Sequence, residues 1–178
     1  MQAIFLGLFA ALVVAADQIT KYLVVANIPL HTQVDVLPGV VGLTYVQNRG
    51  AAFSSFQGAQ WLFALIFVLF TVGVIWEYRK QSMGFTKFEW WCIAAIYGGG
   101  LGNMVDRLRM GYVVDMIDLE FMNFPIFNVA DCFITCGAIA LIAHMVFFNK
   151  TFWKDGNPHR FPRGEAVEQS ETDEECGQ

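Results

Sequence analysis

Charged residues are scarce in this sequence. Only 15% of its 178 residues are Asp, Glu, Lys or Arg, whereas 56% are hydrophobic. Soluble domains carry about 25% charged residues, so this composition excludes an ordinary soluble chain with one or two cores. We therefore interpret the sequence as that of an integral membrane protein.

The sequence also lacks the residue clusters of metal or thiol chemistry. Its four cysteines form no CxxC motif, and its three histidines are far apart. We interpret the cysteines as buried free thiols that act as small hydrophobic residues, and we expect no metal ion and no cofactor. No set of serine, histidine and aspartate is evident; a serine alternative would pair Ser54 with Lys21 as its base.

Long apolar runs are the main feature that is present. A bilayer needs about 20 apolar residues for a helix to cross it, and four runs approach that length, at residues 3–26, 60–76, 88–105 and 129–148. A secretory signal peptide is an alternative reading of the first run, but a basic start and a cleavage site are missing. We expect an all-α fold with four transmembrane helices.

The basic residues predict the orientation of these helices. They gather between the second and third runs and after the fourth, as Arg79, Lys80, Lys87, Lys150, Lys154, Arg160 and Arg163. The other two connections contain only Arg49, Arg107 and Arg109. The positive-inside rule then places both termini in the cytoplasm and the connections at 27–59 and 106–128 on the outer side.

Polar residues converge on the predicted outer ends of the helices. They are Asp17 and Lys21 in the first run, Asn48 in the loop before the second, Asn103, Asp106 and Arg107 in the third, and Asn128 and Asp131 in the fourth. Ionisable groups at this depth are costly in lipid and indicate a functional site. The alternative is a set of snorkelling side chains or simple salt bridges, such as Asp17 with Lys21 and Asp106 with Arg107.

The stretch "GGGLGNMVDR" at residues 98–107 resembles a dinucleotide loop only superficially, because an apolar run precedes it instead of a strand. Small residues allow membrane helices to approach closely, so the four glycines at 98, 99, 100 and 102 predict a helix-packing face. That packing would bring Asn103 and Asp106 close to the neighbouring helices.

The outer connections read as short strands. Both are rich in β-branched and aromatic residues, and Pro38 and Gly39 mark a turn in the first. We expect a small β platform over the site. The end of the chain, "GEAVEQSETDEECGQ", is acidic throughout, so we divide the chain into a membrane domain at 1–149 and a disordered cytoplasmic tail at 150–178.

Five blocks resemble, in order and in placement, those of the bacterial lipoprotein signal peptidase (signal peptidase II) family. They are "DQITK" at 17–21, "NRGAAFS" at 48–54, "GGGLGNMVDR" at 98–107, "GYVVDMID" at 111–118 and "FNVAD" at 127–131. The resemblance covers about residues 1–149.

The resemblance implies an inner-membrane aspartyl endopeptidase that cuts prolipoproteins just before a diacylglyceryl-modified cysteine. It implies that Asp115 and Asp131 are the catalytic pair, supported by Asp17, Lys21, Asn48, Gly50, Asn103, Asp106, Arg107 and Asn128. Two neighbouring carboxyl groups share one proton, which suits such chemistry. The expected partners are lipid-modified substrates and membrane lipid, without nucleic acid, and the chain is expected to act as a monomer.

The residues alone leave two other classes of membrane protein as alternatives. A proton-coupled transporter would also collect carboxylates in a helical bundle, although usually near the bilayer midplane. A membrane scaffold would need no carboxylate pair.

Overall fold

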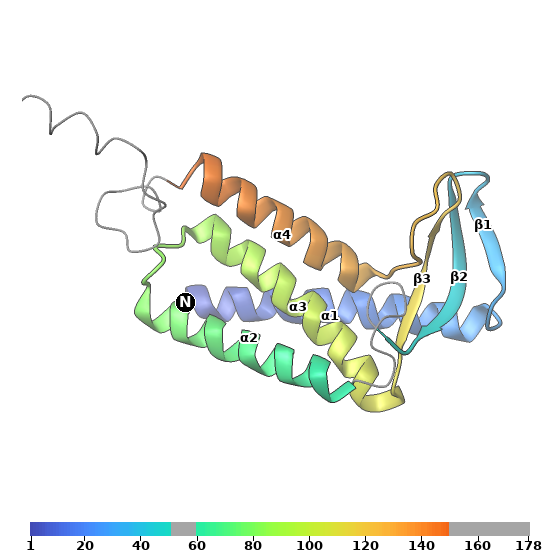
Figure 1. Cartoon of the computed structure of the whole chain (residues 1–178), viewed down its shortest axis with the longest axis horizontal. Coiled ribbons are helices and arrows are strands. Elements are labelled where there is room, and N and C mark those ends of the chain that lie inside the picture. Colours follow the sequence, from blue (N-terminus) through green and yellow to red (C-terminus); the bar gives the residue numbers. More distant parts are fainter. Residues whose placement is uncertain (51–59, 150–178) are drawn as a thin grey trace, which may run out of the picture.

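The computed structural model describes residues 1–50 and 60–149 and contains four helices and three strands in that part of the chain (Figure 1). The helices are α1 (Gln2–Asn27), α2 (Gln60–Lys80), α3 (Lys87–Met110) and α4 (Val129–Phe147). The strands are β1 (Gln33–Leu37), β2 (Val41–Asn48) and β3 (Val113–Leu119). Ser54, the nucleophile of the serine alternative, and the acidic tail lie outside the described residues.

Three of the four helices, α1, α2 and α4, are long and apolar enough to cross a membrane. The remaining helix, α3, does not meet that standard, whereas the sequence analysis expects four transmembrane helices. The physical reason is its position: half of its 24 residues are buried within the protein, including Asn103 and Asp106. A helix that faces protein on most of its surface does not need the hydropathy of one that faces lipid.

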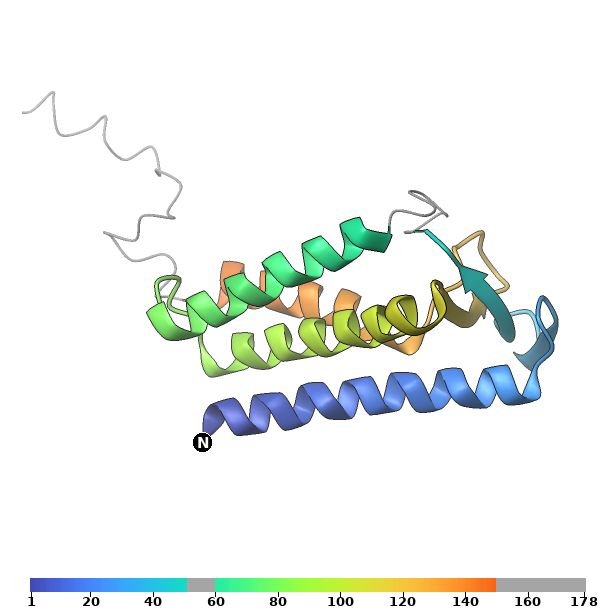
Figure 2. The same ribbon diagram turned by 90° about the horizontal axis from the view of Figure 1, so that it is seen from below.

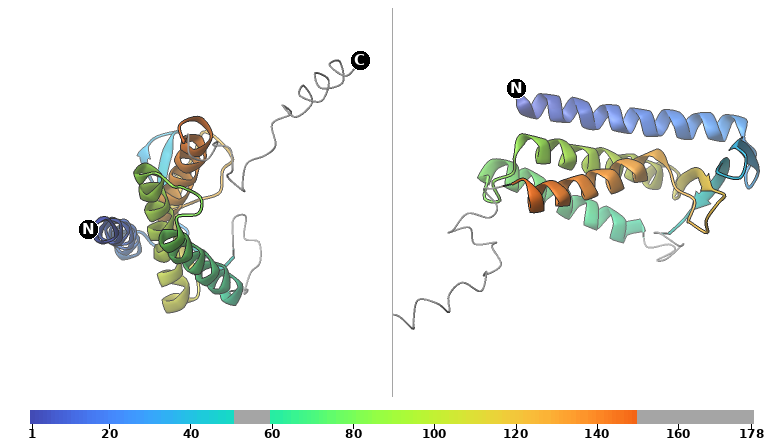
Figure 3. Two further views of the ribbon diagram at one scale, coloured as in Figure 1. Left: turned by 90° about the vertical axis from the view of Figure 1, so that its left-hand side faces the viewer. Right: turned by 90° about the horizontal axis from the view of Figure 1, so that it is seen from above.

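Helix α3 is the centre of the bundle. Figure 2 shows α3 between α1 and α2, and Figure 3 shows α4 beside α3. The glycines of α3 allow this arrangement. A methyl group on Gly102 would lie 2.6 Å from Asp17 Oδ2 of α1, and one on Gly99 would lie 2.5 Å from the Ala130 carbonyl oxygen of α4. The predicted close approach is confirmed, but the glycines face different helices instead of one.

The three strands form an antiparallel sheet in the order β1-β2-β3 at one end of the bundle (Figure 1). This arrangement confirms the predicted β platform. The turn between β1 and β2 includes Gly39 with a φ of 73°, a conformation that favours glycine. An apolar cluster that includes Val24, Tyr45 and Val114 packs the end of α1 against the sheet, so the platform is fixed to the helices.

A second polar cluster lies at the opposite end of the bundle, where α3 begins and α4 ends (Figure 1). Glu89 is fully buried and accepts hydrogen bonds from the Thr86 backbone N–H at 2.7 Å and from Asn149 Nδ2 at 2.8 Å. The His144 ring nitrogen Nδ1 is 3.0 Å from Glu89 Oε1. The sequence gives no local signal of this contact, because Glu89 and His144 are 55 positions apart.

Candidate active site

Asp131 is positioned by the start of α4. Asn128 is the N-cap of this helix, and its side-chain oxygen accepts the Asp131 N–H at 3.0 Å. In return, the Asp131 carboxylate accepts the Asn128 backbone N–H at 3.1 Å. This reciprocal pair is a capping box, and it holds the Asp131 carboxylate against the first turn of the helix.

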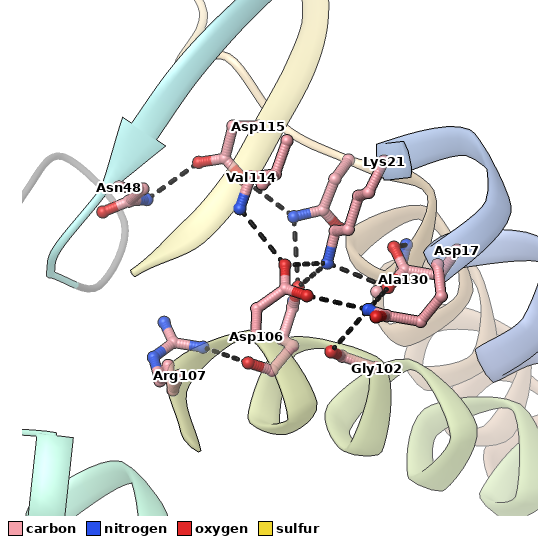
Figure 4. Close-up of polar contacts among 12 residues, drawn as sticks. Asp17, Lys21, Asn48, Gly102, Asp106, Arg107, Val114, Asp115 and Ala130 are labelled. Carbon is pink, nitrogen blue, oxygen red and sulfur yellow. Dashed lines mark hydrogen bonds and ion pairs between the residues drawn. The ribbon is translucent and has the colours of Figure 1, made fainter. Parts of the chain in front are cut away.

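Asp115 reaches the same place from strand β3. It is 3% exposed, and its carboxylate accepts Asn48 Nδ2 at 2.9 Å and Asn128 Nδ2 at 2.7 Å (Figure 4). Asn128 therefore donates to both carboxylates, through its side chain to Asp115 and through its backbone to Asp131. The two aspartates are sixteen positions apart, and the chain between them folds back through the rest of β3 and the following loop.

Burial favours the protonated form of the Asp115 carboxyl group. Removal from water raises the pKa of the Asp115 carboxyl group from 3.8 to about 6, and the nearby Asp131 charge acts in the same direction. The hydrogen bonds from Asn48 and Asn128 oppose this rise because they stabilise the ionised form. The site thus contains a carboxyl group that keeps its proton at a much higher pH than an exposed aspartate does.

Asn103 links this pair to a buried group of charges. Its amide nitrogen donates to Asp131 Oδ1 at 2.8 Å, and its amide oxygen accepts from Lys21 Nζ at 2.9 Å. The same oxygen accepts Asn128 Nδ2 at 3.1 Å. Every polar atom of this side chain is used, so its orientation is determined by its partners.

Lys21 holds two further carboxylates. Its ammonium group is 2.8 Å from Asp17 Oδ2 and 2.8 Å from Asp106 Oδ2, and all three side chains are at least 96% buried. The predicted pair of Asp17 and Lys21 is confirmed. The predicted pair of Asp106 and Arg107 is wrong: consecutive residues of a helix point about 100° apart, and Asp106 faces α1 instead.

This charged triad holds the backbone next to each aspartate of the pair. Asp106 Oδ2 accepts the backbone N–H of Val114 at 3.2 Å, directly before Asp115 (Figure 4). Asp17 Oδ1 accepts the backbone N–H of Ala130 at 3.0 Å, directly before Asp131. One ammonium group, that of Lys21, thereby connects the two chain segments that carry Asp115 and Asp131.

Arg107 has a different set of partners. Its guanidinium group donates to the Gly50 carbonyl at 3.1 Å and to the Asn103 carbonyl at 3.4 Å, and it lies 4.5 Å from the centre of the Phe63 ring. The Gly50 N–H donates to the Asn48 side-chain oxygen at 3.0 Å. Arg107 and Gly50 thus connect α3 to the end of β2, beside Asp115.

A cavity of about 560 Å³ opens onto both aspartates. The predicted site residues that line it are Asn48, Asn103, Arg107, Asp115 and Asp131. Asp17, Lys21, Asp106 and Asn128 lie behind this wall, where they can orient the lining residues but do not face the cavity. The remaining lining residues are mainly apolar and are Val113, Leu119, Phe124, Pro125, Ile126, Phe127, Cys132, Thr135 and Cys136.

Sequence reasoning missed several contributors to this site. Gln18 Nε2 donates to Asp106 Oδ1 at 2.8 Å, and its place inside the polar break of the first run was the available signal. Phe63 lies within an apolar run and gave no signal. Cys132 and Cys136 line the cavity, and Cys136 is exposed, so its interpretation as a buried thiol is wrong, whereas Cys92 is buried as expected.

The described residues provide no evident metal site. Among residues 1–50 and 60–149, no three His, Cys, Asp or Glu side chains are placed to share an ion. The carboxyl groups of Asp115 and Asp131 line one partly apolar cavity, and such a pair can perform proton transfer.

Known proteins share both the fold and the sequence. A bacterial membrane enzyme solved by the in meso method at 2.3 Å resolution superposes with a TM-score of 0.75 and 29% identity, over 89% of this chain and 94% of that one. A second such enzyme, solved at 1.9 Å, gives a TM-score of 0.73 and 31% identity. The fold is thus that of a bacterial membrane enzyme.

Comparisons of the sequence identify the family within this class of proteins. The family model described as Signal peptidase (SPase) II matches residues 9–147. The lipoprotein signal peptidase of Streptococcus agalactiae serotype V is 44% identical over 142 residues, which are 80% of this chain and 92% of that protein. That of Streptococcus pyogenes serotype M2 is 45% identical over 131 residues, 74% of this chain and 86% of that protein. The chain belongs to the lipoprotein signal peptidase (signal peptidase II) family.

Proposed function

We propose that Asp115 and Asp131 are the catalytic pair with which this signal peptidase removes the signal peptide from prolipoproteins, cutting just before a diacylglyceryl-modified cysteine. The assignment rests on the hydrogen bonds of Asn128, which donates from its side chain to Asp115 and from its backbone to Asp131. No other two carboxylates among the described residues both line the 560 Å³ cavity.

The raised pKa of Asp115 supports a division of roles within the pair. Asp115 retains the shared proton and donates a hydrogen bond to the scissile carbonyl oxygen, whereas ionised Asp131 takes a proton from the attacking water. The hydroxide oxygen bonds to the carbonyl carbon, and the resulting tetrahedral intermediate holds the Asp115 proton on its oxygen. Transfer of the Asp131 proton to the departing amide nitrogen then breaks the carbon–nitrogen bond, and the Asp115 proton returns as the new carboxyl group forms.

The rest of the cavity suits a substrate that is partly lipid. Asn48 and Arg107 line it near Asp115 and offer N–H groups to a peptide backbone, while the apolar lining residues between Leu119 and Cys136 offer a surface for hydrocarbon. A lipidated cysteine presents both kinds of group on adjacent atoms. The presence of both polar and apolar residues in the lining of the cavity therefore supports a lipid-modified peptide as the substrate.

We further propose that all four helices cross the cytoplasmic membrane, with both termini in the cytoplasm and the site at the outer face. Helix α3 has 24 residues and runs beside the three apolar helices, so at about 1.5 Å per residue it is long enough to cross a core of about 30 Å. Basic Arg79 and Lys80 end α2 at the end of the bundle away from the sheet. We also propose that the enzyme acts as a monomer, because each buried side-chain nitrogen and oxygen atom of the described residues has a hydrogen-bond partner within the chain.

We assign residues 1–149 to the peptidase domain and residues 150–178 to a cytoplasmic tail. The tail after Arg163 is acidic and free of aromatic residues, so it can bury little apolar surface. Truncation after Arg163 should leave the cleavage rate within about twofold at equal protein level. A tenfold loss would show that the tail is part of the working enzyme.

The direct test is cleavage by purified protein in detergent. A prolipoprotein carrying the diacylglyceryl group and the same prolipoprotein without it are incubated separately, and the products are identified by mass. We expect cleavage of the lipid-modified substrate, with the lipidated cysteine at the new amino terminus, and little cleavage of the unmodified one. An unchanged mass for both, with folded protein, would contradict the proposal.

A further inference from the structure

A second cavity lies away from the catalytic pair, between α1 and α2. These helices lie on opposite sides of α3, as Figures 2 and 3 show, and a groove of about 420 Å³ separates them. The groove is lined by apolar residues of α1, α2 and α3 and shares no residue with the catalytic cavity. Its α1 wall is made of small residues, Gly7, Ala10 and Ala11 among them, which leaves space above that helix.

The length of the groove matches one leaflet of a bilayer. Its lining extends from Ala3 to Ala11 on α1 and from Thr71 to Arg79 on α2. Eight residues of helix rise about 12 Å, and half of a hydrocarbon core is about 15 Å. In a membrane such a groove is filled by hydrocarbon, and its length suits one acyl chain that enters from one surface.

The end of the groove farther from the β sheet is charged and aromatic. Arg79, Tyr78 and Trp90 line it there, where α2 ends and α3 begins. Within residues 1–50 and 60–149, Arg79 forms no ion pair, and its side chain is exposed. A guanidinium group at the mouth of an apolar groove is complementary to a phosphate that is joined to an acyl chain.

We propose that this groove binds one acyl chain of an anionic phospholipid, with the lipid phosphate on Arg79. The orientation proposed above makes it a lipid of the cytoplasmic leaflet. The bound chain would fill the space between α1 and α2 and so support the helices that carry Asp17, Lys21 and Arg107. The site is separate from catalysis, so a failure of the peptidase assignment would leave this proposal standing, and the reverse also holds.

The first test fills the groove. Gly7 lines it, and a Cβ atom added there meets no protein atom within 4 Å, so Gly7→Phe starts a bulky side chain in the open space of the groove. Gly73 of α2 has equally open surroundings but does not line the groove, which makes Gly73→Phe the matched control. The probe is phosphatidylglycerol with palmitoyl and oleoyl chains, and native mass spectrometry in mild detergent counts bound lipid.

We expect one tightly held phosphatidylglycerol on the unchanged protein and on Gly73→Phe, and at least a tenfold loss of that species on Gly7→Phe. Equal lipid retention by the two variants would overturn the proposal. Cleavage of lipid-modified substrate by Gly7→Phe should stay near normal at saturating detergent. A loss of cleavage with unchanged lipid binding would instead assign the groove to the signal helix of the substrate and overturn the proposal too.

The second test concerns the phosphate. Arg79→Gln removes the charge at the groove mouth, and Lys80→Gln removes the same charge one residue further on, outside the groove. We expect Arg79→Gln to weaken phosphatidylglycerol binding about fivefold and Lys80→Gln to leave it nearly unchanged. Binding of zwitterionic phosphatidylcholine should be affected less by Arg79→Gln. Equal effects of the two variants on phosphatidylglycerol would exclude Arg79 as the phosphate site.

Discussion

Asn128 uses its side chain and its backbone to hold Asp115 and Asp131 in one place, and it is itself fully buried. At the scale of single residues, this sharing explains how a strand and a helix present two carboxyl groups to one cavity. The two groups are not equivalent. Asp115 is buried in the sheet, whereas Asp131 belongs to the capping box of α4.

The catalytic assignment predicts the effect of removing either acid. Asparagine nearly matches aspartate in size but cannot exchange a proton, so Asp115→Asn and Asp131→Asn should each lower turnover at least about a thousandfold. Because the two groups act as a unit, the double substitution should be little worse than either single one. The measurement is the rate of cleavage of lipid-modified substrate by protein that elutes as a folded species.

Asp118→Asn is the matched control, because Asp118 lies on the same strand, three residues further on, and does not line the cavity. It should keep most of the activity. The alternative with Ser54 predicts an inactive Ser54→Ala. It conflicts with the contacts of Lys21, whose ammonium group donates to three oxygen atoms and so has one acceptor for each of its N–H groups. A folded Asp131→Asn with a near-normal rate would contradict the aspartyl mechanism.

The pKa of Asp115 predicts a pH dependence of kcat/KM. The mechanism needs protonated Asp115, and a carboxyl group with a pKa of about 6 loses its proton as the pH rises through that value. The value of kcat/KM should therefore fall toward alkaline pH, with the midpoint near pH 6 in the free enzyme.

Asn48 provides the internal test of that pH dependence. Its N–H stabilises the ionised form of Asp115, so Asn48→Ala should raise the pKa of Asp115 and move the alkaline midpoint of kcat/KM to higher pH. Asp118→Asn should leave the midpoint in place. A shift of the midpoint to lower pH in Asn48→Ala would contradict the assignment of the proton to Asp115.

At the scale of secondary-structure elements, Lys21 connects four of them. It lies on α1, and the two carboxylates it holds accept backbone N–H groups from the first turn of α4 and from β3. Asp106 itself belongs to α3. A single buried ammonium group thus fixes the position of the elements that carry Asp115 and Asp131, although it does not face the cavity.

This connection predicts that Lys21→Met is strongly destabilising. It leaves two buried carboxylates without a counter-charge, and breaking a buried ion pair in this way costs about 3–5 kcal/mol. We expect a clear fall in Tm, measured by thermal unfolding in detergent, together with a loss of cleavage. Lys80→Met, at an exposed lysine, is the control and should change neither.

A second substitution distinguishes two causes of the destabilisation in Lys21→Met, the loss of a counter-charge and the loss of packing. Asp106→Asn in the Lys21→Met background removes one of the two unpaired charges, so the double variant should unfold at a higher temperature than Lys21→Met alone. If the double variant unfolds at the lower temperature, the charge argument fails, and the stability contributed by Lys21 lies in its packing.

At the scale of the whole molecule, the two ends of the bundle differ in chemistry. One end carries the β sheet and the cavity with Asp115 and Asp131, and the other carries Arg79, Lys80 and the cluster of Glu89, Asn149 and the partly exposed His144. Apolar side chains of α1, α2 and α4 remain exposed between these ends, where lipid would cover them. This distribution is typical of a protein that crosses a bilayer with one functional face.

The orientation is open to a direct measurement. A reporter that is active only outside the cytoplasm should work when fused after Met110, which precedes β3 at the sheet end, and should fail after Ser82 or Asn149. Those two positions lie at the other end, where Asn149 Nδ2 donates to the Gly84 carbonyl at 3.3 Å. The reverse pattern would place the cavity at the cytoplasmic face and contradict the proposed topology.

Much of the architecture could be predicted from the sequence. The fourth run was expected at 129–148, and α4 is Val129–Phe147; the second began at Gln60 as expected and continues to Lys80. The third was expected to end at 105, but α3 continues to Met110, where Gly111 ends it in the left-handed conformation. Hydropathy could not predict that extension, because Asp106 and Arg107 are polar and their burial depends on neighbouring helices.

By itself the sequence determined the membrane class, the strands and the pair of Asp17 with Lys21, because apolar runs and residue spacing are local properties of the chain. Its ordered blocks also led, through their resemblance to a family, to the proposal of Asp115 and Asp131 as the catalytic pair. Tertiary structure alone decided that Asp106 binds Lys21 instead of Arg107, that Asn128 joins both acids, and that Val114 and Ala130 are held by Asp106 and Asp17. These contacts join residues up to 113 positions apart. They depend on which helices α3 brings together, and a pattern within one segment carries no information about that packing.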